Sequence, residues 1–146
     1  MPKSNIPSAI QALVKLRARG YCEYCLVPFG FSPDTFHFEH ILPLSLGGTS
    51  EAENLAWADG GCNGHKHVKT EHLDPLTKQP SRLFHPRLDN WKEHFQWSED
   101  ETLIIGLTAV GRATVDLLQV NREGNVNLRR LLILVGLHPP KVYPGE

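Results

Sequence analysis

The sequence is poor in cysteine and methionine, and it has no excess of either charge. Its three cysteines are an odd number, and no export signal is visible in residues 1–10, which argues against a disulfide framework. No run approaches the roughly 18 consecutive apolar residues of a membrane span. The sequence therefore predicts a cytoplasmic protein without a membrane span.

The near-neutral charge counts against binding to nucleic acid but does not exclude it. The 15 lysines and arginines face 16 aspartates and glutamates, which gives a formal net charge of −1. Proteins that bind nucleic acid usually carry a basic excess, because much of their affinity comes from neutralising phosphates. Local groups of basic residues could still supply that charge, and the chain has three: Lys15, Arg17 and Arg19; Lys66 and Lys69; Arg129 and Arg130.

The chain of 146 residues is long enough for one domain with a modest core. Its apolar periodicity and turn residues predict an α+β fold. The predicted elements are an N-terminal helix at 6–19, a strand at 35–41, a short polar helix at 62–70, an extended linker at 74–86, a hairpin that pairs 95–97 with 102–107, and two C-terminal helices near 110–118 and 126–135.

Two of the cysteines form a short motif that suits a metal ion. Cys22-Glu23-Tyr24-Cys25 places two thiolates on a tight turn, where both can bind one zinc ion. The Cys-x-x-Cys turn is called the knuckle below, and Cys62 is a third candidate ligand. A second Cys-x-x-Cys turn that ends at Cys62 would have its first cysteine three residues earlier, where the chain has Asp59. Because zinc accepts a carboxylate, we predict a structural zinc site of three cysteines and one aspartate. The alternative is that the thiols are buried as small apolar side chains.

A second set of motifs surrounds the third cysteine. The run Glu39-His40-Ile41-Leu42-Pro43-Leu44-Ser45-Leu46-Gly47-Gly48 precedes Glu53-Asn54-Leu55, and Cys62-Asn63-Gly64-His65-Lys66 follows. In this order and at these spacings, residues 18–70 resemble the HNH endonuclease family. The resemblance implies a zinc-stapled ββα-metal (His-Me) finger at about residues 20–70. This finger would belong to a single domain of residues 1–146, whose accessory part, at about 83–140, holds the hairpin and the two helices.

The family's activity is then the expected one: metal-dependent hydrolysis of DNA phosphodiester bonds, with RNA left open as a substrate. The chemistry needs a deprotonated water and a cation that absorbs charge on the phosphoryl oxygens. The resemblance makes His40 the general base, and a neutral imidazole can take a proton near pH 7. It makes Glu39 a ligand of a magnesium, manganese or zinc ion. Because adjacent strand residues face opposite ways, both can serve one site only if the strand ends or twists at His40.

The remaining motif residues receive roles by the same resemblance. Asn54 would fix the loop that holds the base through bonds from its side chain to the backbone. Asn63 would be a second ligand of the catalytic ion, and His67 lies four residues later, on the same face of a continuous helix. Some members of the family place a metal-binding histidine there, so His67 is a further predicted ligand. Lys66 is the candidate for a phosphate contact.

The aromatic stretch from Leu83 to Trp97 also resembles bacterial members of the family. It could cover the finger and bring Arg87 or His94 near the scissile phosphate. The interpretation we favour for its aromatic side chains is core packing.

Two other functions remain open at this point. The chain could be a non-catalytic, zinc-stabilised module that binds nucleic acid, as the neutral charge and Asp59 would allow. It could also be a protein-interaction domain that keeps the finger as a scaffold. In both cases His40 would lie at the end of a strand, and its side chain would form a hydrogen bond within the core.

Overall fold

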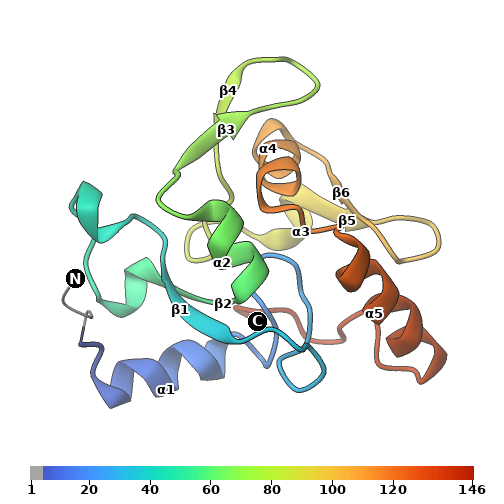
Figure 1. Cartoon of the computed structure of the whole chain (residues 1–146), viewed down its shortest axis with the longest axis horizontal. Coiled ribbons are helices and arrows are strands. Elements are labelled where there is room, and N and C mark those ends of the chain that lie inside the picture. The colour runs from blue at the N-terminus through green and yellow to red at the C-terminus, as the bar shows by residue number, and fades with distance from the viewer. Residues whose placement is uncertain (1–4) are drawn as a thin grey trace.

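The computed structural model describes residues 5–146, so the first four residues of the N-terminal stretch considered above lie outside the described residues. Small antiparallel hairpins alternate with short helices along the chain, which confirms the predicted α+β class (Figure 1). In the described part of the chain, no helix has the length and apolar character needed to cross a membrane. The first helix, α1, spans Ser8–Arg17, somewhat shorter than the predicted 6–19.

The finger is present as two strands and a helix. Strand β1 (Phe36–His40) pairs antiparallel with β2 (Leu55–Asp59), and Phe36 lies opposite Asp59. Helix α2 (Gly60–Lys66) follows β2 without a loop, because the side chain of Asp59 accepts the amide of Cys62 at 2.7 Å and caps the helix. Two short 3₁₀ turns, Leu44–Leu46 and Ala52–Asn54, lie in the connection between the strands.

Aromatic side chains fill the core on either side of the finger. Phe36 and Phe38 of β1 pack against Trp57 of β2, with ring centroids 5.5 and 4.9 Å away. On the C-terminal side, Trp91 and Phe95 are 6% and 2% exposed, and their ring centroids are 5.2 Å apart. Trp97 packs against the same core, so the predicted packing of the aromatic stretch is confirmed.

The C-terminal part also follows the prediction. The hairpin pairs β5 (Phe95–Trp97) with β6 (Ile104–Gly106), directly after the short helix α3 (Trp91–His94). Two helices come next, α4 (Ala109–Leu118) and α5 (Glu123–Leu134), and the second begins three residues before the predicted start.

The predicted linker at 74–86 is wrong in part, because half of a hairpin lies within it. Strand β3 (Glu71–Leu73) pairs with β4 (Pro80–Arg82), and this hairpin stands out at the top of Figure 1. Asp74 organises the turn by accepting the amide of Leu76 and the hydroxyl of Thr77, both at 3.0 Å. It also forms two bonds with Arg112 of α4, at 2.9 and 2.8 Å. The prolines therefore lie in a turn and at the start of an edge strand, positions that tolerate them.

Candidate functional site

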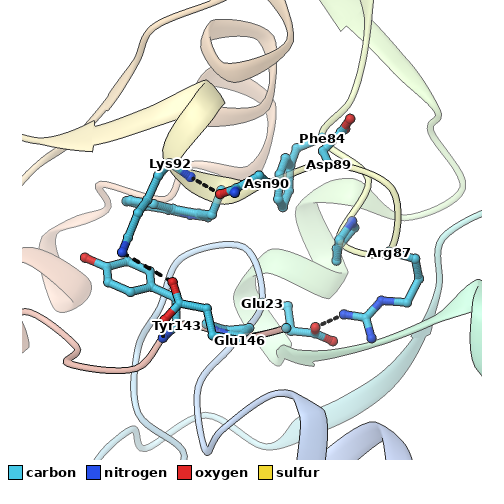
Figure 2. A pocket seen from close by; sticks show the side chains of 12 residues that line it. Glu23, Phe84, Arg87, Asp89, Asn90, Lys92, Tyr143 and Glu146 are labelled. Atoms are coloured by element: carbon cyan, nitrogen blue, oxygen red, sulfur yellow. Dashed lines mark hydrogen bonds and ion pairs between the residues drawn. The ribbon is translucent and has the colours of Figure 1, made fainter.

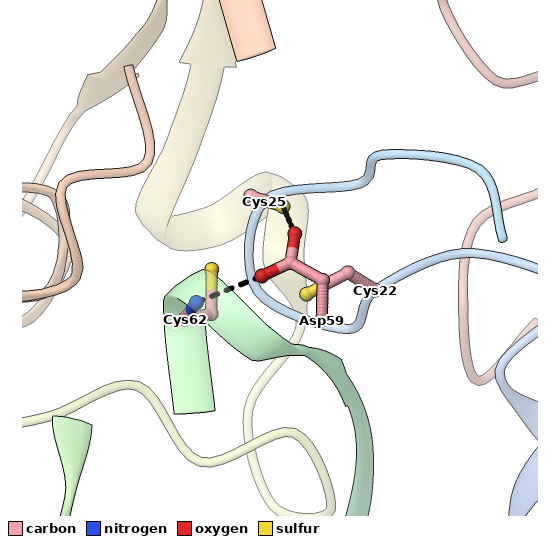
Figure 3. Close-up of side chains that lie close together, drawn as sticks. All are labelled: Cys22, Cys25, Asp59 and Cys62. Carbon is pink, nitrogen blue, oxygen red and sulfur yellow. Dashed lines mark hydrogen bonds between the residues drawn. The ribbon is translucent and has the colours of Figure 1, made fainter. Parts of the chain in front are cut away.

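Three cysteines and one aspartate converge where the knuckle meets the start of α2. The ligand atoms of Cys22, Cys25, Asp59 and Cys62 all lie within 4.8 Å of one another, and each of the four residues is 0% exposed (Figure 3). The predicted grouping of these four residues is therefore confirmed, including the aspartate in place of a fourth cysteine. Three soft sulfur donors and one oxygen in a closed, buried cluster are a donor set that suits a tetrahedral metal ion.

The two oxygens of Asp59 have different partners. Oδ1 accepts the amide of Cys62 at 2.7 Å and the guanidinium of Arg122 at 2.9 Å. Oδ2 accepts the thiol of Cys25 at 2.9 Å, so it faces the sulfur atoms. Burial raises the pKa of Asp59 and, more strongly, that of the Cys25 thiol. One oxygen is thus fixed by the protein, and the other is directed at the position that an ion would take.

Two arginines that sequence reasoning did not assign to this site flank the cluster. Arg122 Nη1 lies 3.7 Å from the sulfur of Cys62, and Arg129 donates to the carbonyl of Cys25 at 3.1 Å. Arg129 is only 2% exposed, so it cannot supply the surface charge that its basic group was considered for. If a divalent ion were bound, four anionic ligands would outnumber its charge, and these guanidiniums would offset the excess negative charge. Both lie more than 50 residues from their partners, and no local pattern in the sequence marks them.

His40 stands at the end of β1 and is half-buried. Its Nε2 lies 3.0 Å from the hydroxyl of Ser50, which comes from the loop after the strand. Burial, and then the positive charge of Lys66, lower the pKa of His40 below its ordinary value. The imidazole is therefore neutral at pH 7 and able to accept a proton.

Asn54 fastens the loop that follows His40. Its Oδ1 accepts the amide of Leu42 at 2.8 Å, and its Nδ2 donates to the carbonyls of Leu42 and Thr49 at 2.9 and 2.8 Å. The loop also needs Gly48, since a Cβ there would lie 1.8 Å from the carbonyl oxygen of Leu42. Asn54 thus makes side-chain to backbone bonds of the kind that the resemblance implies.

We expect Asn54→Ala to lower the free energy of unfolding by about 1 to 2 kcal/mol, because three hydrogen bonds are lost at partly solvated positions. Urea denaturation measures this change. Asn127→Ala is the matched control, since Asn127 is exposed on α5 and has one long contact, at 3.4 Å, with Arg130. Equal stabilities of the two variants would show that Asn54 does not hold the loop.

Glu39 is buried, and its carboxylate pairs with a buried lysine. It is 3% exposed, its Oε1 forms an ion pair with Lys66 Nζ at 2.7 Å, and its Oε2 accepts the hydroxyl of Tyr24 at 2.7 Å. Lys66 is 1% exposed and also donates to the carbonyl of Ile41 at 2.9 Å. Lys66 is therefore part of the buried interior and not of a solvated face. In this arrangement the Glu39 carboxylate faces Lys66 and Tyr24, and Lys66 is too buried to offer its ammonium to a phosphate at the surface.

The other two predicted ligands of the catalytic ion lie at the end of α2. Asn63 is partly buried on the helix, and its carbonyl accepts the amide of His67 at 2.9 Å. The helix ends at Lys66, and His67 is exposed and has a φ of 50°, outside the helical range. Helical spacing therefore does not place the His67 side chain over Asn63. Among residues 5–146, neither Glu39 nor His67 belongs to a group of three or more His, Cys, Asp or Glu side chains close enough to share an ion.

Most of the remaining basic candidates have partners within the chain. Arg87 pairs with the buried carboxylate of Glu23, which also accepts the amide of Trp57 at 2.8 Å (Figure 2). His94 Nδ1 lies 2.7 Å from the hydroxyl of Thr108. These contacts attach the aromatic stretch to the knuckle and to α4, so in this structure Arg87 and His94 join parts of the fold together.

The N-terminal basic group behaves in the same way. Arg17 donates to the carbonyls of Ala52 and Leu55, and so joins α1 to the start of β2. The ammonium of Lys15 lies over the ring of Trp57, 5.1 Å from its centroid. The near-neutral chain therefore uses much of its positive charge internally.

Comparison with known proteins finds that the finger is similar to one family model. The family model described as HNH endonuclease matches residues 22–69, from the first cysteine of the knuckle to just beyond α2. Comparisons with curated proteins and with solved structures gave no match. The matched segment contains the metal-binding cluster, His40 and Asn54, and it excludes the C-terminal hairpins and helices.

Proposed function

Because residues 22–69 match the HNH endonuclease family model, we propose that this chain is an endonuclease that hydrolyses phosphodiester bonds of DNA with His40 as the general base. The observation that carries the proposal is the placement of His40, which is half-buried at the end of a strand whose following loop is fastened by Asn54, and whose burial lowers its pKa. A base for water activation needs this combination of a free proton acceptor and a fixed position.

The proposed reaction follows from that geometry. Neutral His40 takes a proton from a water molecule, and the resulting hydroxide attacks the phosphorus. The bond from phosphorus to the 3′ oxygen then breaks, and this oxygen leaves with the bonding electron pair and is protonated by solvent. HNH domains use divalent ions, which stabilise charge on the phosphoryl and leaving oxygens. Because Glu39 is engaged by Lys66 and Tyr24, we assign no step of this chain's reaction to an ion on Glu39.

The Cys22, Cys25, Asp59 and Cys62 cluster serves, in this proposal, as a structural zinc site. Its support is the buried, closed donor set and the carboxylate oxygen that faces the thiols. Structural zinc sites are four-coordinate and hold segments together that have little core of their own. The site would join the knuckle to α2.

The function is tested by incubating supercoiled plasmid with the purified chain and magnesium, manganese or zinc in turn. Conversion to nicked or linear DNA that depends on protein concentration is the expected result. Single-stranded DNA and RNA of matched sequence, added in parallel, define the substrate class. Intact DNA under every metal would end the enzyme proposal.

The same chemistry predicts how cleavage depends on pH. Protonated His40 cannot accept a proton, so activity is lost as pH falls through its pKa. Because that pKa is lowered, the neutral form persists to lower pH than for a free histidine, whose pKa is about 6.5. We therefore expect kcat/KM to rise with pH with a midpoint below about pH 6.5, and to level off about one pH unit above that midpoint. An acidic limb with its midpoint above pH 7 would show that another group is the base.

One observation favours a second candidate, a zinc-stabilised module that binds nucleic acid without cutting it. The engagement of Glu39 by Lys66 and Tyr24 is what a finger without a catalytic ion would contain. Retention of labelled DNA that weakens with salt, together with no cleavage under any metal, would support this candidate.

A further inference from the structure

The ion pair between Glu39 and Lys66 lies directly beside His40 in the chain. Lys66 Nζ pairs with the side chain of Glu39 at 2.7 Å and donates to the carbonyl of Ile41 at 2.9 Å, so a single ammonium holds the residues on both sides of His40. We propose that Lys66 is a positioning residue for the general base, and that it does not contact the substrate phosphate. The inference rests on the proposed function.

Burial determines what Lys66 can do. The residue is 1% exposed, and its ammonium is balanced by the carboxylate of Glu39, which is itself 3% exposed. To reach a phosphate, Lys66 would have to leave Glu39 as a buried carboxylate with only the hydroxyl of Tyr24 as a partner, and an unpaired buried charge is strongly unfavourable. The ion pair therefore stays closed while substrate is bound.

The Glu39 network, which we define as Tyr24, Glu39 and Lys66, also joins the metal cluster to the base. Tyr24 lies between Cys22 and Cys25 in the knuckle, and Lys66 lies on α2, the helix that carries Cys62. Both donors to Glu39 thus come from segments that an ion in the cluster would hold together. Asn54 holds the backbone on the far side, at Leu42, so His40 is fixed from two directions.

Two substitutions of Lys66 separate positioning from phosphate contact. Lys66→Met removes the charge, whereas Lys66→Arg keeps it but adds bulk that a 1% exposed site does not accept. With a duplex oligonucleotide as substrate, we expect both variants to lower kcat at least tenfold and to leave KM within twofold of wild type. Lys69→Met is the matched control, because Lys69 is exposed three residues further along, and it should keep the wild-type kcat.

Binding without cleavage supplies the decisive measurement. In the His40→Ala background, the slope of log Kd against log salt should be the same with and without Lys66→Met. A lysine that neutralises a phosphate would instead lower that slope by about 0.9, and Lys66→Arg would then retain activity. Either of these results would overturn the proposal. A third readout is hydrogen exchange at the amides of Ile41 and Leu42, which should become faster in Lys66→Met.

Tyr24→Phe keeps the proposal testable if the lysine variants do not fold, since it removes only one hydroxyl from the Glu39 network. We expect a lower kcat, an unchanged KM and an unchanged metal content per chain. Cleavage by wild type together with wild-type kcat in Tyr24→Phe and Lys66→Met would overturn this inference alone. Absence of cleavage by wild type, or equal cleavage by His40→Ala, would overturn the proposed function and this inference with it.

Discussion

We expect replacement of His40 with alanine to lower the rate of plasmid cleavage by about two to four orders of magnitude and to leave the fold intact. The rate falls because no other group in the proposed site takes over the proton of the attacking water. The fold persists because His40 is only half-buried and its side chain has one polar partner, the hydroxyl of Ser50 at 3.0 Å. The melting temperature should therefore stay within about 4 °C of wild type, a shift that corresponds to about 1 kcal/mol or slightly more.

The control for this variant lies on the same strand. His37→Ala also removes an imidazole from β1, but His37 is exposed and lies opposite Ala58, three residues before His40. It should cleave at the wild-type rate. If His37→Ala and His40→Ala lost equal activity, or if neither lost any, the assignment of the base to position 40 would have to be given up.

The sequence predicted the parts of the site that depend on local pattern. The Cys-x-x-Cys spacing, the position of Asp59 three residues before Cys62, and the alternation around Phe36 and Phe38 each act over a few residues. These patterns predict a turn, a helix cap and a strand, and the geometry of each depends mainly on a short segment of sequence. The convergence of the four ligands and the strand that ends at His40 therefore agree with the structure.

The parts that sequence reasoning missed depend on contacts between distant segments. Lys66 reads as a surface lysine on a polar helix, and its burial arises only because Glu39 lies opposite it on β1. Arg122 and Arg129 reach the metal cluster from the far end of the chain. In each case the charge of a remote partner decides whether a basic side chain is buried, and the local sequence carries no record of that partner.

The hairpin of β3 and β4 was missed for a related reason. Its segment contains prolines and has little apolar alternation, so the local pattern predicts a linker. The turn is organised by Asp74, whose ion pair with Arg112 lowers the pKa of its carboxyl far below the ordinary value. The hairpin is thus held to α4 by an ion pair. It lacks the alternating apolar residues from which strands are predicted.

Removal of metal from the Cys22, Cys25, Asp59 and Cys62 cluster is the second change with a large expected effect. We expect one zinc ion per chain in protein purified without added metal, and a fall of at least about 10 °C in melting temperature after treatment with a strong chelator. At roughly 2 to 4 °C per kcal/mol, this fall corresponds to about 3 to 5 kcal/mol. Atomic emission spectrometry and a thermal melt with and without chelator measure both quantities.

The size of this effect follows from the charges around the cluster. Burial raises the pKa of the Cys25 thiol, so without an ion this thiol is protonated at neutral pH. Arg122 and the buried Arg129 then lose part of the negative charge that offsets their own burial. A bound metal ion would keep the sulfur atoms as thiolates. The negative charge beside Arg122 and Arg129 would then be retained.

Cys62→Ser tests the same argument without a chelator. It weakens one ligand and should reproduce most of the loss of stability, together with a lower metal content. The control is Ser45→Ala, at an exposed position in the loop after β1, which should match wild type in both measurements. Zinc well below one per chain, with a melting temperature that neither chelator nor Cys62→Ser changes, would mean that the four side chains form a buried polar cluster without an ion. Asp59 would then join the knuckle to α2, because it accepts hydrogen bonds from both Cys25 and Cys62.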